Sequence, residues 1–192
     1  INNELINILG VGEGEKIIID MSEAIRLNNS LYEIPGIWFK DNGEIIKNER
    51  GPLVNINDSI PDFSLTDEAR FNRPMGGKIF RTIPVETYRG CPFKCTFCTE
   101  GLDYYTKISR FSTTMIQSEI EFIGEKMCKV REQGGRSDLY IADSNFGMYK
   151  EDLETAKALA SSQSKYGWPD HINASTGKNQ KERVLEVAKT VN

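Results

Sequence analysis

The stretch RGCPFKCTFC, residues 89–98, holds three of the four cysteines in this chain of 192 residues. Cys91, Cys95 and Cys98 follow the spacing C-x3-C-x2-C. An odd number of clustered thiols cannot pair completely into disulfides, and structural zinc normally takes four ligands, often as two close pairs. Thiolates at short spacings also suit iron–sulfur clusters. A cube bound by three cysteines, with one iron open to a small molecule, fits the missing fourth ligand, so this interpretation is favoured over zinc and disulfides.

The cysteines follow an expected strand and begin a series of strand–helix units. The expected strands are residues 81–88, 138–142 and 171–175, and the expected helices start at Ser112 and cover 151–165 and 181–191. Apolar side chains recur at helical spacing in the first of these helices: Ile116, Ile120, Ile123, Met127 and Val130. Consecutive βα units predict an α/β fold with a parallel sheet. An open doubly wound sheet and part of a (β/α) barrel both fit this pattern.

The residues before the cysteines predict a different organisation. LINILGVG (residues 5–12) indicates a short buried strand and KIIIDMSEAIRL (16–27) a helix, as at the end of an α/β domain. GIWFKDNGEIIKNE (36–49) predicts a β-hairpin around Asp41-Asn42-Gly43. The following Pro- and Gly-rich stretch indicates a linker. We therefore expect domain boundaries at 1–35, 36–78 and 79–192, in a fragment of a longer protein.

Composition limits the classes of function. With 39% apolar and 27% charged residues, the chain is expected to fold around a core. Its net charge of −4 argues against nucleic acid as a partner. No apolar run approaches the roughly 20 residues of a membrane span, and no secretory signal is visible. We therefore expect a cytoplasmic protein without a membrane span.

Polar side chains are expected where each parallel strand ends, at the edge where α/β sheets gather their sites. The second strand is followed by Asp143, Ser144 and Asn145, and the third by a stretch that contains Lys178. These groups would suit a zwitterionic amino acid and a ribose. For Asp143 and Asn145 the alternative is local turn or cap bonding, and for Lys178 it is a solvated lysine near a helix start.

The cysteine motif, with the aromatic Phe97 before the last cysteine, resembles the radical S-adenosylmethionine (SAM) superfamily over residues 79–192, about the first half of its barrel. The resemblance implies a [4Fe–4S] cluster on Cys91, Cys95 and Cys98, with SAM on the fourth iron and Phe97 against the adenine. Asp143, Ser144 and Asn145 stand where that superfamily often has Gly-Gly-Glu beside the SAM amine. Lys178 would neutralise the SAM carboxylate. The resemblance further implies that SAM is cleaved to a 5′-deoxyadenosyl radical, which abstracts hydrogen from a substrate.

The upstream segment VGEGE (residues 11–15), with its helix and hairpin, resembles the junction in radical SAM proteins that carry a cobalamin-binding domain. Cobalamin and methyl transfer to an unactivated carbon are then expected, with methylthio transfer, rearrangement and cyclisation as alternatives. Gly12 to Glu15 would lie at the edge of a cobalamin nucleotide pocket. The alternative is a βα turn in which the glycines only serve the backbone conformation. A reductant such as flavodoxin or ferredoxin and a small-molecule, peptide, lipid or sugar substrate are implied. A non-catalytic iron–sulfur carrier or sensor, or a zinc-stabilised module, stays open.

Overall fold

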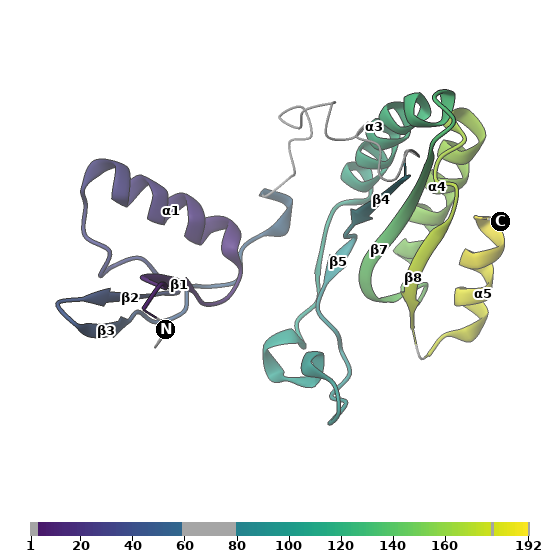
Figure 1. The fold of residues 1–192 in the computed structure, drawn as a ribbon. Coiled ribbons are helices and arrows are strands. Elements are labelled where there is room, and N and C mark those ends of the chain that lie inside the picture. Colours follow the sequence, from purple (N-terminus) through teal and green to yellow (C-terminus); the bar gives the residue numbers. More distant parts are fainter. Residues whose placement is uncertain (1–3, 59–79, 178, 192) are drawn as a thin grey trace. The chain divides into compact units, whose positions relative to one another are not determined.

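The structure is a computed structural model that describes residues 4–58, 80–177 and 179–191 (Figure 1). The chain divides into two compact units, Ile1–Ile60 and Pro61–Asn192. Each unit has its own sheet and its own apolar core. Within the described ranges, no helix combines the length and apolar character needed to cross a bilayer.

The first unit packs one helix on a small antiparallel sheet. The sheet has the order β1-β2-β3, and its elements are β1 (Ile8–Gly10), β2 (Ile37–Asp41), β3 (Glu44–Lys47) and the helix α1 (Gly14–Leu27), followed by a 3-10 turn, η1 (Ile56–Asp58). Ala24 of α1 joins Ile37 and Phe39 of β2 in the core. The predicted helix and hairpin are therefore confirmed.

Two details of this unit bear on the sequence predictions. Asn42 and Gly43 turn the hairpin with φ of 48° and 84°, the left-handed region that an Asn-Gly pair tolerates. The prediction that the first strand is buried is wrong, because Leu9 is 38% exposed. Among the described strands, β1 lies at the edge of the sheet and pairs with β2 alone, so a run of apolar residues here does not indicate burial on both faces.

In its described residues, the second unit contains three parallel strands, each followed along the chain by a helix. The strands are β4 (Phe80–Val85), β7 (Arg136–Phe146) and β8 (Ile172–Thr176), in the order β4-β7-β8, and the helices are α3 (Thr113–Glu132), α4 (Glu151–Tyr166) and α5 (Lys181–Thr190). All three helices lie on one face of the sheet (Figure 1). The predicted α/β series with a parallel sheet is confirmed.

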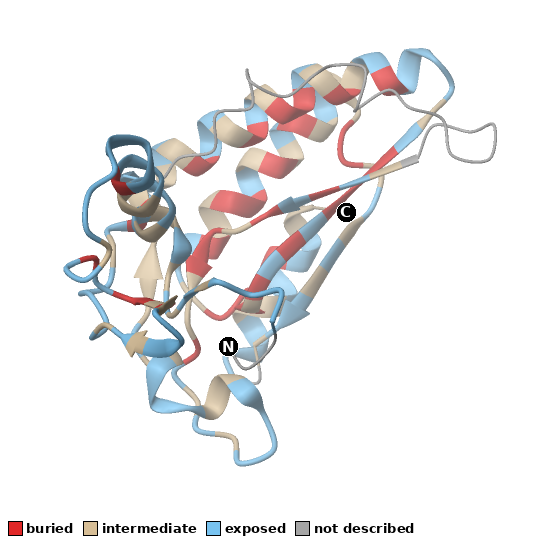
Figure 2. Ribbon diagram, turned by 60° about the vertical axis from the view of Figure 1, so that its left-hand side comes forward, coloured by how far each residue is buried: buried red, intermediate tan, exposed pale blue. Residues whose placement is uncertain are grey.

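Helix α3 shows why the local prediction succeeded. The Ser112 hydroxyl caps it by accepting a hydrogen bond from the Met115 amide at 3.3 Å. The five apolar residues predicted at helical spacing are all buried and share one core with Leu139 and Ile141 of β7. Figure 2 shows buried positions recurring along the helices that lie beside the sheet. Apolar periodicity and an N-cap both depend on residues close together in the chain, so they can be recognised from the sequence alone.

The strand ends differ from the sequence prediction. β4 ends at Val85 rather than at residue 88, because the chain turns into a separate short strand, β5 (Tyr88–Arg89). β7 extends to Phe146, past the predicted end at residue 142, and its pairing with β8 is irregular between Ile141 and Phe146. The polar residues predicted for a loop after β7 therefore lie inside its last part.

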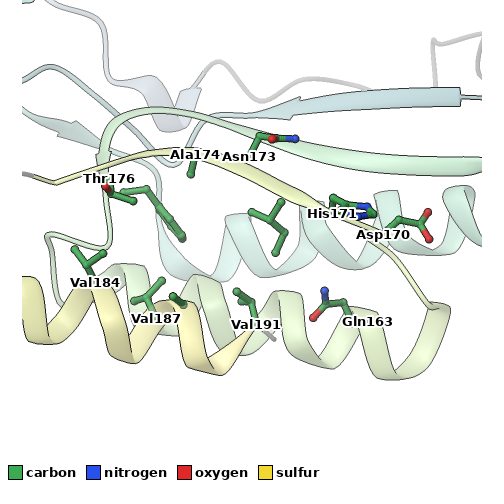
Figure 3. A pocket seen from close by; sticks show the side chains of 12 residues that line it. Gln163, Asp170, His171, Asn173, Ala174, Thr176, Val184, Val187 and Val191 are labelled. Carbon is green, nitrogen blue, oxygen red and sulfur yellow. The ribbon is translucent and has the colours of Figure 1, made fainter.

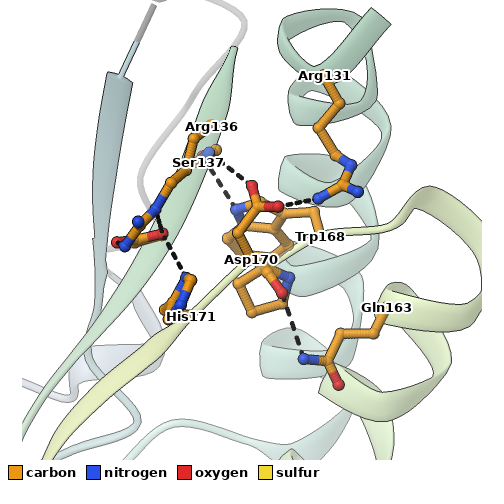
Figure 4. A network of polar contacts seen from close by, with 9 residues as sticks. Arg131, Arg136, Ser137, Gln163, Trp168, Asp170 and His171 are labelled. Atoms are coloured by element: carbon orange, nitrogen blue, oxygen red, sulfur yellow. Dashed lines mark hydrogen bonds and ion pairs between the residues drawn. The ribbon is translucent and has the colours of Figure 1, made fainter. Parts of the chain in front are cut away.

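A polar network ties the amino ends of β7 and β8 to the helices (Figure 4). The Asp170 carboxylate accepts a hydrogen bond from the Ser137 amide at 2.8 Å and pairs with Arg131 of α3. The indole of the fully buried Trp168 donates to the Ser137 hydroxyl at 3.1 Å. These contacts lie at the end of the strands opposite the cysteines, where barrel-like folds place stabilising residues.

Candidate cysteine-loop site

The cysteine loop is closed at its base by a two-stranded clasp. β5 pairs antiparallel with β6 (Ser109–Arg110), and Tyr88 stands opposite Arg110. Between them the chain makes two 3-10 turns, η3 (Thr99–Gly101) and η4 (Asp103–Tyr105). The Cys91 amide donates to the Tyr105 carbonyl at 2.7 Å, which joins the start of the loop to its return. The clasp fixes where the cysteine loop leaves the carboxyl end of the sheet.

Two glycines allow the loop to pack on itself. Gly90 has φ of +103°, and a Cβ there would lie 2.4 Å from the Lys107 carbonyl oxygen. A Cβ on Gly101 would lie 2.2 Å from the Cys95 carbonyl oxygen and 3.0 Å from the Cys95 nitrogen. Both contacts are with backbone, which cannot rotate away as a side chain can. The loop therefore depends on glycine at these two positions.

The three cysteines of the loop differ in burial. Cys91 is 6% exposed, Cys95 is half-buried and Cys98 is exposed, and all are free thiols. The Cys98 amide donates to the Cys95 carbonyl at 3.1 Å, so these two cysteines are joined by one tight turn. Cys128 lies apart on α3, where its sulfur is 3.9 Å from a Glu132 oxygen. The fourth cysteine is therefore not part of the loop.

The donor set fits an iron–sulfur cube. In the described ranges, no three His, Cys, Asp or Glu side chains converge closely enough to hold one metal ion. In a cube, each thiolate binds a different iron, so the sulfurs need not converge on a single point. Three soft thiol ligands on one tight loop, with the third exposed at its outer side, match this requirement.

Phe97 lies on the exposed side of the same loop. Its side chain is 88% exposed, and Leu102 nearby in the sequence is 59% exposed. A largely exposed ring beside a cysteine provides a flat apolar surface on which a planar base can stack. The contact between Phe97 and an adenine stays a prediction.

Asp143 joins the ends of β4 and β7. Its carboxylate is 2% exposed and accepts hydrogen bonds from the Thr87 amide at 2.7 Å, from the Thr87 hydroxyl, and from the Tyr88 amide at 3.4 Å. Burial raises the pKa of Asp143 to about 6, although the hydrogen bonds from Thr87 and Tyr88 act to lower it. The Asp143 carboxylate thus fixes the position of Thr87 and Tyr88, the residues that lead into the cysteine loop.

Asn145 contacts the loop itself. Its side-chain amide donates to the Cys91 sulfur at 3.3 Å, and its backbone amide donates to the Tyr88 hydroxyl at 2.8 Å. Asn145 is 2% exposed and Tyr88 1% exposed. Burial, and then the charge of Asp143, raise the pKa of the Tyr88 hydroxyl, so this group stays neutral. Asp143 and Asn145 were predicted beside the SAM amine; the structure shows both bonded within the protein, and SAM contact stays a prediction.

A second layer behind Tyr88 was missed by the sequence analysis. The Arg110 guanidinium lies 4.8 Å from the Tyr88 ring centroid and 3.9 Å from that of Tyr149, and 3.9 Å from a carboxylate oxygen of Asp152. The other Asp152 oxygen accepts from the amides of Gly147 and Tyr149 at 2.8 and 2.9 Å. Burial raises the pKa of Asp152. An acidic residue in the first turn of the predicted helix was the only available signal.

The remaining predicted residues follow β7 and β8. Ser144 is half-buried between the buried Asp143 and Asn145, in keeping with the alternation of a strand. Lys178 lies outside the described residues. Next to it, a Cβ on Gly177 would lie 2.7 Å from the Met148 Cβ, so the chain after β8 packs closely on the chain after β7. The segments after both strands therefore come together, as the sequence analysis expected.

A separate groove of about 430 Å³ runs between β8 and α5 (Figure 3). Its walls are mostly apolar, from Phe146, Ile172, Val184 and Val187, with Asp170 and His171 at one end. Of the predicted site residues that the structure describes, none lines it. The groove is therefore distinct from the cysteine loop.

Comparison with known proteins agrees with the geometry. No protein-family model matches the sequence. The cobalamin-dependent radical SAM methyltransferase TokK of Streptomyces tokunonensis is 30% identical over 190 residues, which are 96% of this chain and 26% of TokK. Among solved structures, the cobalamin-dependent radical SAM enzyme OxsB matches 95% of this chain and 25% of its own, with a TM-score of 0.64 and 20% identity.

A further solved structure has a similar fold. The radical SAM methyltransferase TsrM of Kitasatospora setae, solved with cobalamin and a [4Fe–4S] cluster, matches 97% of this chain and 36% of its own, with a TM-score of 0.61 and 13% identity. The chain thus spans about a quarter of the length of TokK and OxsB. Its cysteine loop, its fold and its similarity to TokK together show that the chain belongs to the cobalamin-dependent radical SAM family.

Proposed function

We propose that this chain is the part of a radical SAM enzyme that holds the [4Fe–4S] cluster on Cys91, Cys95 and Cys98 and leaves one iron open for SAM. The observation that carries the proposal is the glycine-dependent loop of three thiols, closed by the β5–β6 clasp at the carboxyl end of a parallel sheet. A carrier of electrons alone would use a fourth protein ligand, and the fourth cysteine lies on α3, outside the loop.

The residues of this chain would bind the cluster, orient SAM and shield both from water. A cluster held by Cys91, Cys95 and Cys98 would supply the one-electron reduction by which SAM is cleaved to methionine and a 5′-deoxyadenosyl group. Phe97 offers its exposed ring to the adenine. Asp143, through Thr87 and Tyr88, fixes where the loop leaves β4. Ser144 and Lys178 are the remaining candidates for the polar groups of SAM.

The sheet is proposed to be the first part of a (β/α) barrel. The described helices cover one face of β4, β7 and β8 (Figure 1). On β7 the opposite face presents Tyr140, 44% exposed, and Ala142, also exposed. A sheet face that carries apolar side chains and that none of the described helices covers is what a barrel interior requires. The similarity to OxsB and TsrM supports this architecture.

Cobalamin is proposed as the second cofactor, and methyl transfer as the reaction. TokK and TsrM are methyltransferases, and TsrM and OxsB have been solved with cobalamin. In this chain, Gly12 has φ of +119°, which only glycine adopts easily. Glu13 does not cap α1 but accepts a hydrogen bond from the Val54 amide at 2.8 Å. A Cβ added to Gly14 would meet no atom within 4 Å, so the VGEGE turn leaves space beside this glycine. A reductant such as flavodoxin or ferredoxin completes the proposal.

The test is anaerobic reconstitution of the full-length protein with iron and sulfide, followed by reduction in the presence of SAM and cobalamin. The proposal predicts 5′-deoxyadenosine or a methylated product, and loss of both in Cys95→Ala. Cys128→Ala is the matched control and should keep activity, because Cys128 lies outside the loop. An assembled cluster that yields neither product would favour an electron carrier or sensor, and zinc in place of iron would favour a structural module.

A further inference from the structure

We propose that Asn145 is a positioning residue for the cluster, whose side-chain amide hydrogen-bonds to the thiolate of Cys91 and raises the reduction potential of the cluster. The inference rests on the proposed function, because it assigns a role to one residue toward the [4Fe–4S] group. The contact that carries it is the 3.3 Å hydrogen bond from Asn145 Nδ2 to Cys91 Sγ, between residues 54 positions apart.

The two partners of this contact are shielded from water. Asn145 is 2% exposed and Cys91 is 6% exposed, whereas Cys98 is exposed. A hydrogen bond in such surroundings is stronger than in water, and water cannot readily replace it if it is removed. A protein donor is therefore expected to have a larger effect on the bound sulfur at Cys91 than at the exposed Cys98.

Asn145 is held so that its side chain faces the sulfur. Its backbone amide donates to the Tyr88 hydroxyl at 2.8 Å, and its carbonyl oxygen accepts from the Met148 amide at 3.2 Å. Cys91 is fixed from the other side by its own amide, which donates to Tyr105 at 2.7 Å. Both ends of the Asn145–Cys91 contact are therefore anchored by backbone bonds that do not involve the cluster.

The chemistry of the donor explains why an amide suits this position. Once it binds iron, the Cys91 sulfur is a thiolate, and a hydrogen bond to an ionised acceptor is stronger than one to a neutral thiol. Each electron added to the cluster increases the negative charge on the sulfurs, so a donor favours the reduced state and raises the potential. A carboxylate cannot donate when ionised, so at a pH at which the new carboxyl is ionised Asn145→Asp would lower the potential.

The experiment measures the midpoint potential of the reconstituted full-length protein by EPR-monitored redox titration without SAM. Asn145→Ala is expected to make one-electron reduction about tenfold less favourable, which corresponds to a midpoint about 59 mV more negative. Asn145→Asp keeps the size of the side chain, so it tests the same donor without leaving a cavity, and its shift should be at least as large. Asn173→Ala, an exposed asparagine on β8, is the matched control and should keep the wild-type potential.

Three results would overturn the inference. If the wild-type protein assembles no [4Fe–4S] cluster, the proposed function fails and the inference fails with it. If the cluster assembles and either Asn145 variant keeps the wild-type potential, only the inference fails. If a variant binds less cluster but the remaining cluster titrates as in the wild type, Asn145 merely holds the loop together, and the assigned effect on potential is wrong.

Discussion

Replacement of Gly101 by alanine should disrupt the cysteine loop, because an added methyl group would collide with the backbone of Cys95. A Cβ at this position would lie 2.2 Å from the carbonyl oxygen of Cys95 and 3.0 Å from its nitrogen and carbonyl carbon. Atoms in ordinary contact lie roughly 3.5 Å apart, so the backbone around Cys95 would have to move by about 1 Å. Forced insertion into packed structure costs about 1–3 kcal/mol, and metal or cofactor sites tolerate displacements of only about 0.5 Å.

We therefore expect Gly101→Ala to bind clearly less iron and sulfide per chain after anaerobic reconstitution. Its free energy of unfolding, measured by denaturant titration, should be lower by about 1–3 kcal/mol. Gly14→Ala is the matched control, because a Cβ on Gly14 meets no atom within 4 Å and the residue begins α1. It should bind iron as the wild type does. If Gly101→Ala retains the wild-type iron content and stability, the packing of the loop around Cys95 does not have the role assigned to it.

Three further predictions concern the surroundings of the site. Asp143→Ala should lower the unfolding free energy at pH 8 by about 1–3 kcal/mol for each buried Thr87 donor left without an acceptor. Asp143→Asn keeps one acceptor oxygen and should lower it less. Equal losses in the two variants would contradict the hydrogen-bond assignment. Burial, followed by the charge of Glu86, raises the pKa of Glu119 from 4.5 to about 7. Between these pH values the native protein keeps a proton that the unfolded chain has released. The stability that this group contributes is therefore present below pH 4.5 and is lost as the pH rises to about 7. Melting temperatures between pH 5 and 8 should therefore fall less in Glu119→Gln, and an unchanged slope would refute this. Asp170→Asn should destabilise the protein by about 1–3 kcal/mol while the EPR spectrum of its cluster stays unchanged, because Asp170 lies at the opposite end of the strands; an altered spectrum would be inconsistent with that placement.

Local signals in the sequence predicted the helices and the hairpin. The Ser112 cap and the apolar row of α3 are set by residues close in the chain, and so is the Asn42-Gly43 turn. The three βα units followed from the same kind of signal, since each strand and helix could be identified separately. The cysteine spacing is also local, which is why the ligand residues could be proposed from the sequence.

The contacts that organise the site could not be predicted, because they join distant parts of the chain. Asp143 reaches Thr87 across 56 positions, and Asn145 reaches Cys91 across 54. Strand β7 continues past its predicted end because it pairs with β8 through an irregular register, a tertiary feature without a sequence pattern. The clasp that pairs Tyr88 with Arg110 has strands of two residues, too short for any periodicity.

The proposed open iron is tested most directly by EPR of the reduced, anaerobically reconstituted full-length protein, recorded with and without SAM. We predict a [4Fe–4S]⁺ signal that SAM alters, and that is lost or severely reduced when Cys91, Cys95 or Cys98 is replaced by alanine. A cluster whose spectrum SAM leaves unchanged, or a signal that survives loss of these cysteines, would contradict a three-cysteine cluster with one iron free to bind SAM.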